Sequence, residues 1–112
     1  ALSVTGANLS GHNMRGWDLH NTIFDSVSLI ETDLTGANLS GVSFSRARMQ
    51  NTLLQSSDLM GADLSGHGMY DMDLSSCNLS NAVLGGCNLC CTNITGCKTD
   101  GIVLEGASLN MV

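Results

Sequence analysis

The chain has 112 residues, a formal net charge of −6 at pH 7, and charged residues at only 12% of its positions. This balance argues against nonspecific binding to nucleic acid or to an anionic membrane, because both need a basic face that attracts phosphates. No apolar stretch approaches the roughly 20 residues that cross a bilayer. The length predicts that residues 1–112 form a single domain. Because the first residue is Ala1 rather than Met, we expect a processed protein or a fragment or domain of a longer chain.

A period of five residues runs through the whole sequence. In blocks of five from Ala1 it reads ALSVT, GANLS, GHNMR, GWDLH and onward without an insertion or deletion. The fourth place is apolar in 21 of 22 blocks, the exception being Thr99. Since five is neither the 3.6 of a helix nor the 2 of a flat strand, each block is predicted to be a short extended segment followed by a corner.

The other places of the block have their own chemistry. Mostly small residues fill the second place, so the second and fourth places are predicted to point inward, as positions i and i+2 of an extended segment do. The first place holds 11 of the 13 glycines, which predicts corners with positive φ. Asn and Asp crowd the third place, where their side chains can hydrogen-bond nearby backbone at a turn.

The blocks GANLS, which occurs twice, and GADLS resemble the A-(D/N)-L-x-x pattern of the pentapeptide-repeat family, and the resemblance covers the entire chain. It implies an all-β fold, a right-handed quadrilateral parallel β-helix with twenty residues per coil and about five and a half coils. Residues twenty apart are then expected to stack. The expected core ladder is Leu9, Met14, Leu19, Phe24, Leu34, Leu39, Phe44, Met49, Leu59, Leu64, Met69, Leu79, Leu89 and Leu104.

Two regions depart from the pattern, residues 12–17 and 96–100, and an aromatic pair between them follows it. His12 and Trp17 are large for second places, and we expect them to plug the N-terminal end. Phe24 should stack on Phe44 in the next coils. The segment GCKTD (96–100) carries Thr99 in place of an apolar residue, so we expect a distorted coil or bulge there.

The histidines and cysteines do not predict a metal centre or a disulfide. His67 is expected beneath Cys87, and Cys77 beneath Cys97, but stacked columns present parallel side chains. A zinc site needs four convergent ligands, and a disulfide needs Cβ atoms about 3.8 Å apart. We expect no metal and no cofactor. The five clustered cysteines favour a reducing compartment, and we expect a cytoplasmic location.

Neighbouring carboxylates occur at Asp71 and Asp73 and at Glu31 and Asp33. Acid–base catalysis also needs a concave site that holds a substrate, and a convex rod is not expected to provide one. The sequence therefore predicts solvated carboxylates and no enzymatic activity.

Three groups of residues are candidate contact surfaces. The first is an acidic stripe on two adjoining faces, made of Asp18, Asp33, Asp58, Asp71 and Asp73. The second is an apolar group on one face, made of Ile23, Val83 and Val103, although single exposed apolar residues also occur without a function. The third consists of end contacts at Trp17, Met111 and Val112, since a parallel coil leaves unpaired backbone at its ends.

These surfaces support a non-enzymatic structural or protein-interaction module that binds another protein or domain, including a second copy end to end, and neither nucleic acid nor membrane directly. Two alternatives stay open. One branch of the family protects DNA gyrase by imitating duplex DNA, as in fluoroquinolone resistance. A rod of about 26 Å would need about fifteen negative charges, whereas this chain has 10 acidic and 4 basic residues. The other alternative is a bacterial effector scaffold.

Overall fold

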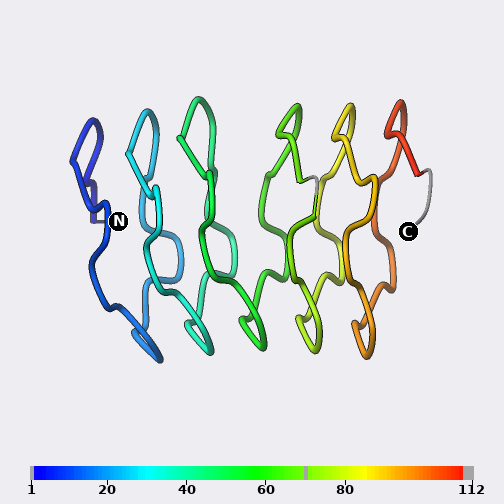
Figure 1. Ribbon diagram of the computed structural model, residues 1–112, viewed down its shortest axis with the longest axis horizontal. Coiled ribbons are helices and arrows are strands. Elements are labelled where there is room, and N and C mark those ends of the chain that lie inside the picture. The colour runs from blue at the N-terminus through cyan, green and yellow to red at the C-terminus, as the bar shows by residue number, and fades with distance from the viewer. Residues whose placement is uncertain (1, 70, 110–112) are drawn as a thin grey trace.

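Third-place residues pair in parallel with the residues twenty positions later, as Ser3 does with Ile23 and Ile23 with Ser43. Sixteen such bridges wind the chain into a right-handed quadrilateral parallel β-helix (Figure 1). The computed structural model describes residues 2–69 and 71–109, and within them each block contributes one bridge residue and no helix forms. The coils stack along the longest of three extents, 32, 22 and 21 Å.

Each of the four faces shows one column of third-place residues to solvent. Face 1 carries Ser3, Ile23, Ser43, Asp63, Val83 and Val103; face 2 carries Asn8, Ser28, Arg48, Gly68, Asn88 and Ser108; face 3 carries Asn13, Asp33, Leu53, Asp73 and Asn93; face 4 carries Asp18, Asn38, Asp58, Asn78 and Lys98. Faces 3 and 4 adjoin, as do faces 1 and 2.

The corners have positive φ at the glycines, as predicted, and also at first-place residues of other types. All first-place residues that the structure describes have positive φ, between 67° and 75° for glycine and between 56° and 60° for ten residues of other types. The third-place Asn and Asp side chains support these corners by accepting the backbone N–H two residues ahead, as Asn38 Oδ1 does from Ser40 at 3.1 Å. This local acceptor is a reason for the Asn and Asp in that column.

The fourth-place side chains fill the interior. Of the residues expected in the core ladder, all are buried except Leu9 and Leu104, which are partly buried. The rings of Phe24 and Phe44 stack with centroids 5.9 Å apart and an angle of 13° between their planes. Burial of this continuous apolar column is the main stabilising contribution to a solenoid of this kind.

Second-place hydroxyls and thiols add a link between coils. Thr52 Oγ1 lies 2.8 Å from Leu29 O, and Cys77 Sγ lies 2.9 Å from Leu54 O. In both cases the acceptor is the fourth-place carbonyl 23 residues earlier. The same link is made by Thr32, Cys87, Thr92 and Cys97. A second-place Thr or Cys therefore satisfies its own polar atom while it ties two coils together.

The ladder has a break at one level of the stack. Among the described residues, Arg48 and Gly68 on face 2 and Leu53 and Asp73 on face 3 form no bridge, whereas the other pairs of these two faces do. Faces 1 and 4 stay bridged between the same two coils. Figure 1 shows the wider gap between these coils in the green part of the ribbon. We call this opening the seam.

The backbone hydrogen bonds of face 3 are also interrupted at the seam. In the coils before and after the seam they are regular, with Leu53 N–H donating to Thr32 O at 3.0 Å and Leu74 N–H to Asn93 O at 2.8 Å. Across the seam, within the described residues, Asp73 N–H donates no such bond to Thr52 O. The seam therefore leaves backbone groups of both coils without their ladder partners.

The seam lies where two large side chains occupy second places. His67 follows Ala47 in its column, and Met72 follows Thr52, whereas the next coil has Cys87 and Thr92 in these places. The imidazole keeps an inter-coil link, with Nε2 2.6 Å from Phe44 O. A close-packed interior has little room for the extra volume of His67 and Met72, and we attribute the separation of the coils to these two side chains.

The expectation of a distorted coil at 96–100 is wrong. Lys98 bridges Asn78, Lys98 O accepts a hydrogen bond from Leu79 N–H at 2.8 Å, and Gly96 has the usual corner φ of 73°. Thr99 puts a polar side chain where the other blocks have an apolar one. The ladder depends on the backbone and continues unchanged.

Candidate functional site

A hollow of about 220 Å³ opens on face 3 at the seam. It is lined by Asn51, Thr52, Leu53, Asp71, Met72 and Asp73, which come from the two coils that the seam separates. The hollow thus occurs where the ladder is open. A convex rod was not expected to carry a concave site on its flank, and this feature corrects that expectation.

The hollow combines apolar and acidic groups. Leu53 is 43% exposed although it is apolar, and Met72 is partly buried against the core. Asp71 stands at the corner, with φ of 57°, and Asp73 stands in the third-place column. This arrangement gives an apolar surface with carboxylates beside it, which suits a side chain that has an apolar stem and a positively charged head.

Asp33 and Asp73 are equivalent positions in different coils, and their partners differ. The Oδ2 atom of Asp33 lies 3.3 Å from the Nη1 of Arg15, eighteen residues earlier. The Oδ2 atom of Asp73 accepts a hydrogen bond at 3.3 Å from Nε2 of Gln55, also eighteen residues earlier. A neutral amide therefore stands beside Asp73 where a guanidinium stands beside Asp33.

Local hydrogen bonds lower the pKa values of both carboxylates. Hydrogen bonds from Thr35 lower the pKa of Asp33, with a smaller contribution from Arg15. Hydrogen bonds from Ser75 lower the pKa of Asp73, with a smaller contribution from Gln55. The pKa of Asp73 is therefore lowered although no cationic side chain of the described residues is paired with it.

The other residues of the predicted acidic stripe do not form a continuous acidic surface. Asp18 and Asp58 alternate with Asn38 and Asn78 on face 4, and Lys98 follows them in the column. Neighbouring acids of one column are therefore two ladder steps apart, about 9.6 Å.

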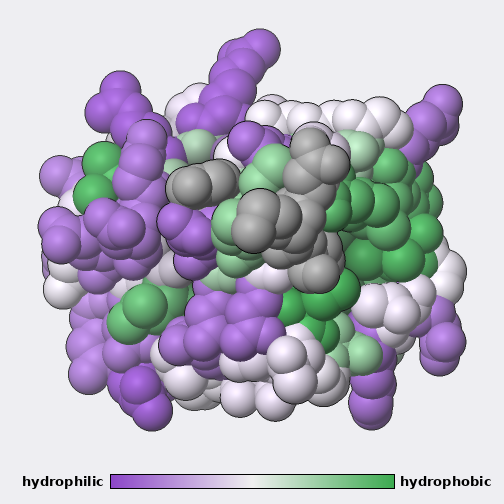
Figure 2. Space-filling model, turned by 45° about the vertical axis from the view of Figure 1, so that its right-hand side comes forward, coloured by the Kyte–Doolittle hydropathy of each residue, from purple (hydrophilic) through white to green (hydrophobic). Residues whose placement is uncertain are grey.

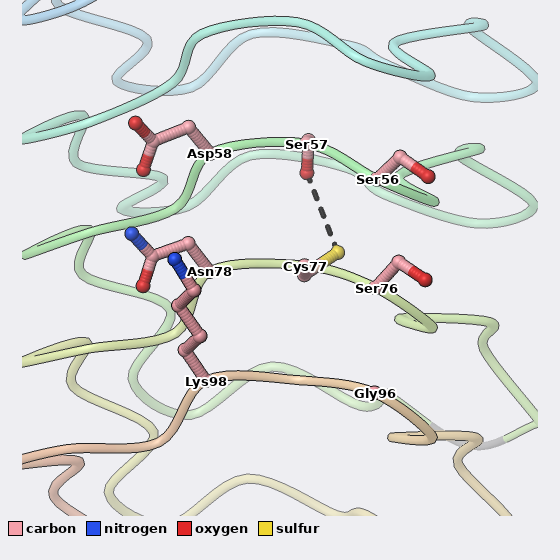
Figure 3. A pocket seen from close by; sticks show the side chains of 8 residues that line it. All are labelled: Ser56, Ser57, Asp58, Ser76, Cys77, Asn78, Gly96 and Lys98. Atoms are coloured by element: carbon pink, nitrogen blue, oxygen red, sulfur yellow. Dashed lines mark hydrogen bonds between the residues drawn. The ribbon is translucent and has the colours of Figure 1, made fainter.

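The surroundings of Asp18 and Asp58 differ from those of Asp73. Asp18 Oδ1 lies 2.6 Å from His20 Nδ1, and this hydrogen bond lowers the pKa of Asp18. Asp58 lines a polar hollow of about 210 Å³, where Figure 3 shows Lys98 extending along the column toward Asn78.

The three residues of the predicted apolar group do not come together. Val83 and Val103 are bridged neighbours on face 1. Ile23 lies on the same face, but Ser43 and Asp63 stand between it and Val83. The group is therefore a pair of valines and a separate isoleucine.

The N-terminal side chains His12 and Trp17 are both exposed, Trp17 at 53%, so neither is sealed into the core as a plug. The opposite end of the described coils carries an apolar hollow of about 210 Å³, whose lining includes Ile94, Leu104 and Leu109. Figure 2 shows this apolar surface at the right-hand side of the molecule. The predicted end contacts Met111 and Val112 lie outside the described residues.

The cysteines are free thiols. Burial raises the pKa values of Cys77, Cys87 and Cys97, which opposes formation of the reactive thiolate. Within the described ranges, His, Cys, Asp and Glu form no group of three or more that could hold a metal ion. The same ranges contain no helix long and apolar enough to cross a bilayer.

The hollow depends on residues that the sequence pattern did not single out as a site. Leu53 is an apolar residue in a third place and Met72 is a residue in an inward second place, and the repeat pattern alone assigns neither of them to a site. The signal that could have found the hollow is the size of His67 and Met72 relative to Ala47 and Thr52.

The inward places, the corners and the ladder define the chain as a right-handed β-helical solenoid built from five-residue repeats. The sequence matches the family described as pentapeptide repeats, in 8 copies, over residues 5–41, 28–66 and 71–106. The chain belongs to the pentapeptide-repeat family.

Solved structures of this family share the fold. A pentapeptide-repeat protein, Rfr23, from the cyanobacterium Cyanothece 51142 is 22% identical, with a TM-score of 0.76 over 95% of this chain and 90% of that one. The protein alr5209 from Nostoc PCC 7120 is 25% identical, with a TM-score of 0.56 over 87% and 84%.

A third structure is QnrB1, a plasmid-mediated fluoroquinolone resistance protein, at 16% identity and a TM-score of 0.60 over 92% of this chain and 64% of that one. At this identity the likeness is one of fold alone. No curated protein matches the sequence.

Proposed function

We propose that this chain is a non-enzymatic protein-binding module that contacts its partner through the hollow on face 3. The observation that carries the proposal is the exposure of Leu53, an apolar third-place residue, inside a hollow on the flank of the coil. Buried apolar anchors beside polar groups are typical of the energetic centre of a protein interface.

Several features support a binding role over a catalytic one. The family and the structural neighbours are repeat proteins named for their architecture. The hollow offers Asp71 and Asp73 as its ionisable groups and no histidine, cysteine or lysine beside them. Two carboxylates carry out acid–base chemistry in a site that encloses the substrate and sets their pKa values apart, whereas this hollow opens on the flank of the coil.

Imitation of duplex DNA has less support. Duplex DNA carries a charge about every 1.7 Å along its axis, whereas Asp18 and Asp58 stand two ladder steps apart and Lys98 follows them on face 4. The likeness to QnrB1 is limited to the fold.

The proposal is tested by site-specific photo-crosslinking. Benzoylphenylalanine is placed at position 53, and at position 103 as a control, since Leu53 and Val103 are both 43% exposed third-place residues on different faces. Each variant is irradiated in an extract of the source organism, and adducts are identified by mass spectrometry. A partner captured from position 53 and not from position 103 supports the proposal. Equal capture from both positions, or none from position 53, contradicts it.

A further inference from the structure

We infer that the hollow on face 3 receives an arginine or lysine side chain from a basic segment of the partner protein. This inference rests on the proposed function and names the chemistry of the partner. Three independent features of the seam carry it: a carboxylate without a cation, backbone groups without ladder partners, and an exposed apolar surface between them.

The first feature is the missing cation at Asp73. On the same face, the equivalent Asp33 already has the guanidinium of Arg15 at 3.3 Å, whereas Asp73 has the neutral amide of Gln55. Asp71 adds a second carboxylate to the same hollow. Face 3 thus shows within one chain how an arginine joins a third-place aspartate, and at the seam a neutral amide takes the place of that arginine.

The second feature is the unpaired backbone. Within the described residues, Thr52 O accepts no ladder bond from Asp73 N–H, and Thr52 lines the hollow. A guanidinium or an ammonium has only donors to offer, five in arginine and three in lysine. The residues that line the hollow therefore supply a carbonyl oxygen and two carboxylates, an acceptor set that matches such a head group.

The third feature is the apolar surface of Leu53 and Met72. An acidic cluster alone would attract any cation, including a hydrated metal ion. The methylene stem of lysine or arginine packs on apolar surface while the charged head reaches polar groups. The combination of Leu53 and Met72 with Asp71 and Asp73 therefore selects a long cationic side chain.

The test is a titration of the ¹⁵N-labelled chain, at low ionic strength, with the blocked peptide acetyl-Gly-Ser-Arg-Gly-Ser-amide. Citrulline replaces arginine in the control peptide, because citrulline keeps the shape and loses the charge. We expect amide shifts confined to residues 51–54 and 71–73 with the arginine peptide, and none with the citrulline peptide. Shifts spread over carboxylates of all faces, or equal shifts with citrulline, would overturn the inference.

Matched variants distinguish peptide binding at the hollow from attraction of the peptide by the net negative charge of the chain. The Asp71→Asn, Asp73→Asn double variant removes two charges, and asparagine already occupies the first place at Asn51 and the third place at Asn93. It should raise the Kd of the arginine peptide at least tenfold. The Asp58→Asn, Asp63→Asn double variant removes the same charge from faces 4 and 1 and should change the Kd less than twofold. Equal effects of the two double variants would contradict a specific site.

Leu53→Asn tests the apolar surface, with Ile23→Asn as the control on face 1. Leu53→Asn should weaken peptide binding at least threefold, and Ile23→Asn should leave it unchanged; no effect of Leu53→Asn would contradict the role of the apolar surface. Circular dichroism and thermal unfolding show whether each variant keeps the fold. A partner crosslinked at position 53 whose capture survives the Asp71→Asn, Asp73→Asn changes would sustain the proposed function and refute the cationic side chain.

Discussion

Leu53 and Asp73 occupy the same column one coil apart, yet no bridge joins them. The residue before Asp73 is Met72, in a second place where the preceding coil has Thr52 and the following coil has Thr92. A larger inward side chain in one coil thus coincides with separation of the backbones and with a hollow on the outer face. At this level of the solenoid, the size of an inward side chain and the shape of the outer face therefore change together.

Met72→Thr is expected to close the seam. Threonine is the residue of the neighbouring coils in this column, and its hydroxyl would reach Met49 O, 23 residues earlier, as Thr52 Oγ1 reaches Leu29 O. The backbone amides of Leu54 and Asp73 would then regain ladder partners. We expect their hydrogen exchange to slow at least tenfold, measured by ¹⁵N NMR.

Met69→Leu is the control for this experiment, because it changes a buried fourth-place methionine of the adjacent block and leaves the second place alone. It should not alter exchange at Leu54 or Asp73. Unchanged exchange in a folded Met72→Thr variant would show that Met72 does not hold the seam open.

Much of the fold follows from the sequence because every block repeats the same local constraints. Glycine at Gly6 or Gly61 indicates the corner, Asn38 indicates the turn acceptor, and Phe24 and Phe44 lie twenty residues apart and stack. Each of these signals lies within one block or at a fixed spacing. The period therefore predicts the core and the ladder together.

The site could not be predicted in the same way, because it depends on a comparison between coils. The fourth-place Thr99 predicted a distortion at 96–100, but a polar side chain in this place leaves the backbone ladder intact. Met72 follows the repeat in its place and departs from it in size relative to Thr52. Only the packed structure shows that the ladder opens at this level.

Thr52→Val tests the link between coils. Valine keeps the shape and removes the hydroxyl that lies 2.8 Å from Leu29 O. We expect the free energy of unfolding to fall by about 1 kcal/mol, measured by urea denaturation. Thr22→Val is the matched control, since Thr22 is also a buried second-place threonine but makes no side-chain hydrogen bond to a described residue. An equal loss in both variants would rule out the hydrogen bond as the cause.

Gly41→Ala and Gly61→Ala compare two corners with nearly the same backbone. Both glycines have φ near 70°, at 70° and 67°, so alanine is strained at each by about 1 kcal/mol or more. At Gly41 an added Cβ would also collide with Oδ1 of Asn21, whereas at Gly61 it meets nothing. Gly41→Ala should therefore lower the melting temperature more than Gly61→Ala. The excess should vanish in the Asn21→Ala background, and its persistence there would refute the collision.

Asp63→Asn tests how the third-place carboxylates contribute to stability as pH changes. Hydrogen bonds from Ser65 lower the pKa of Asp63 from its ordinary value of 3.8. A carboxylate whose pKa is lower in the folded state stabilises the fold above the unfolded pKa, and this stabilisation is lost as pH falls through the folded pKa. Asparagine keeps the acceptor for Ser65 N–H, at 3.0 Å in the aspartate, but does not titrate.

The Asp63→Asn variant should thus stay close to the parent at pH 7 and lose less stability between pH 5 and pH 2, measured by urea denaturation. Asp63→Ala should be less stable by about 1 kcal/mol at pH 7 because it loses the acceptor as well. An acid profile of Asp63→Asn identical to that of the parent would show that this carboxylate does not contribute to the acid sensitivity of the fold.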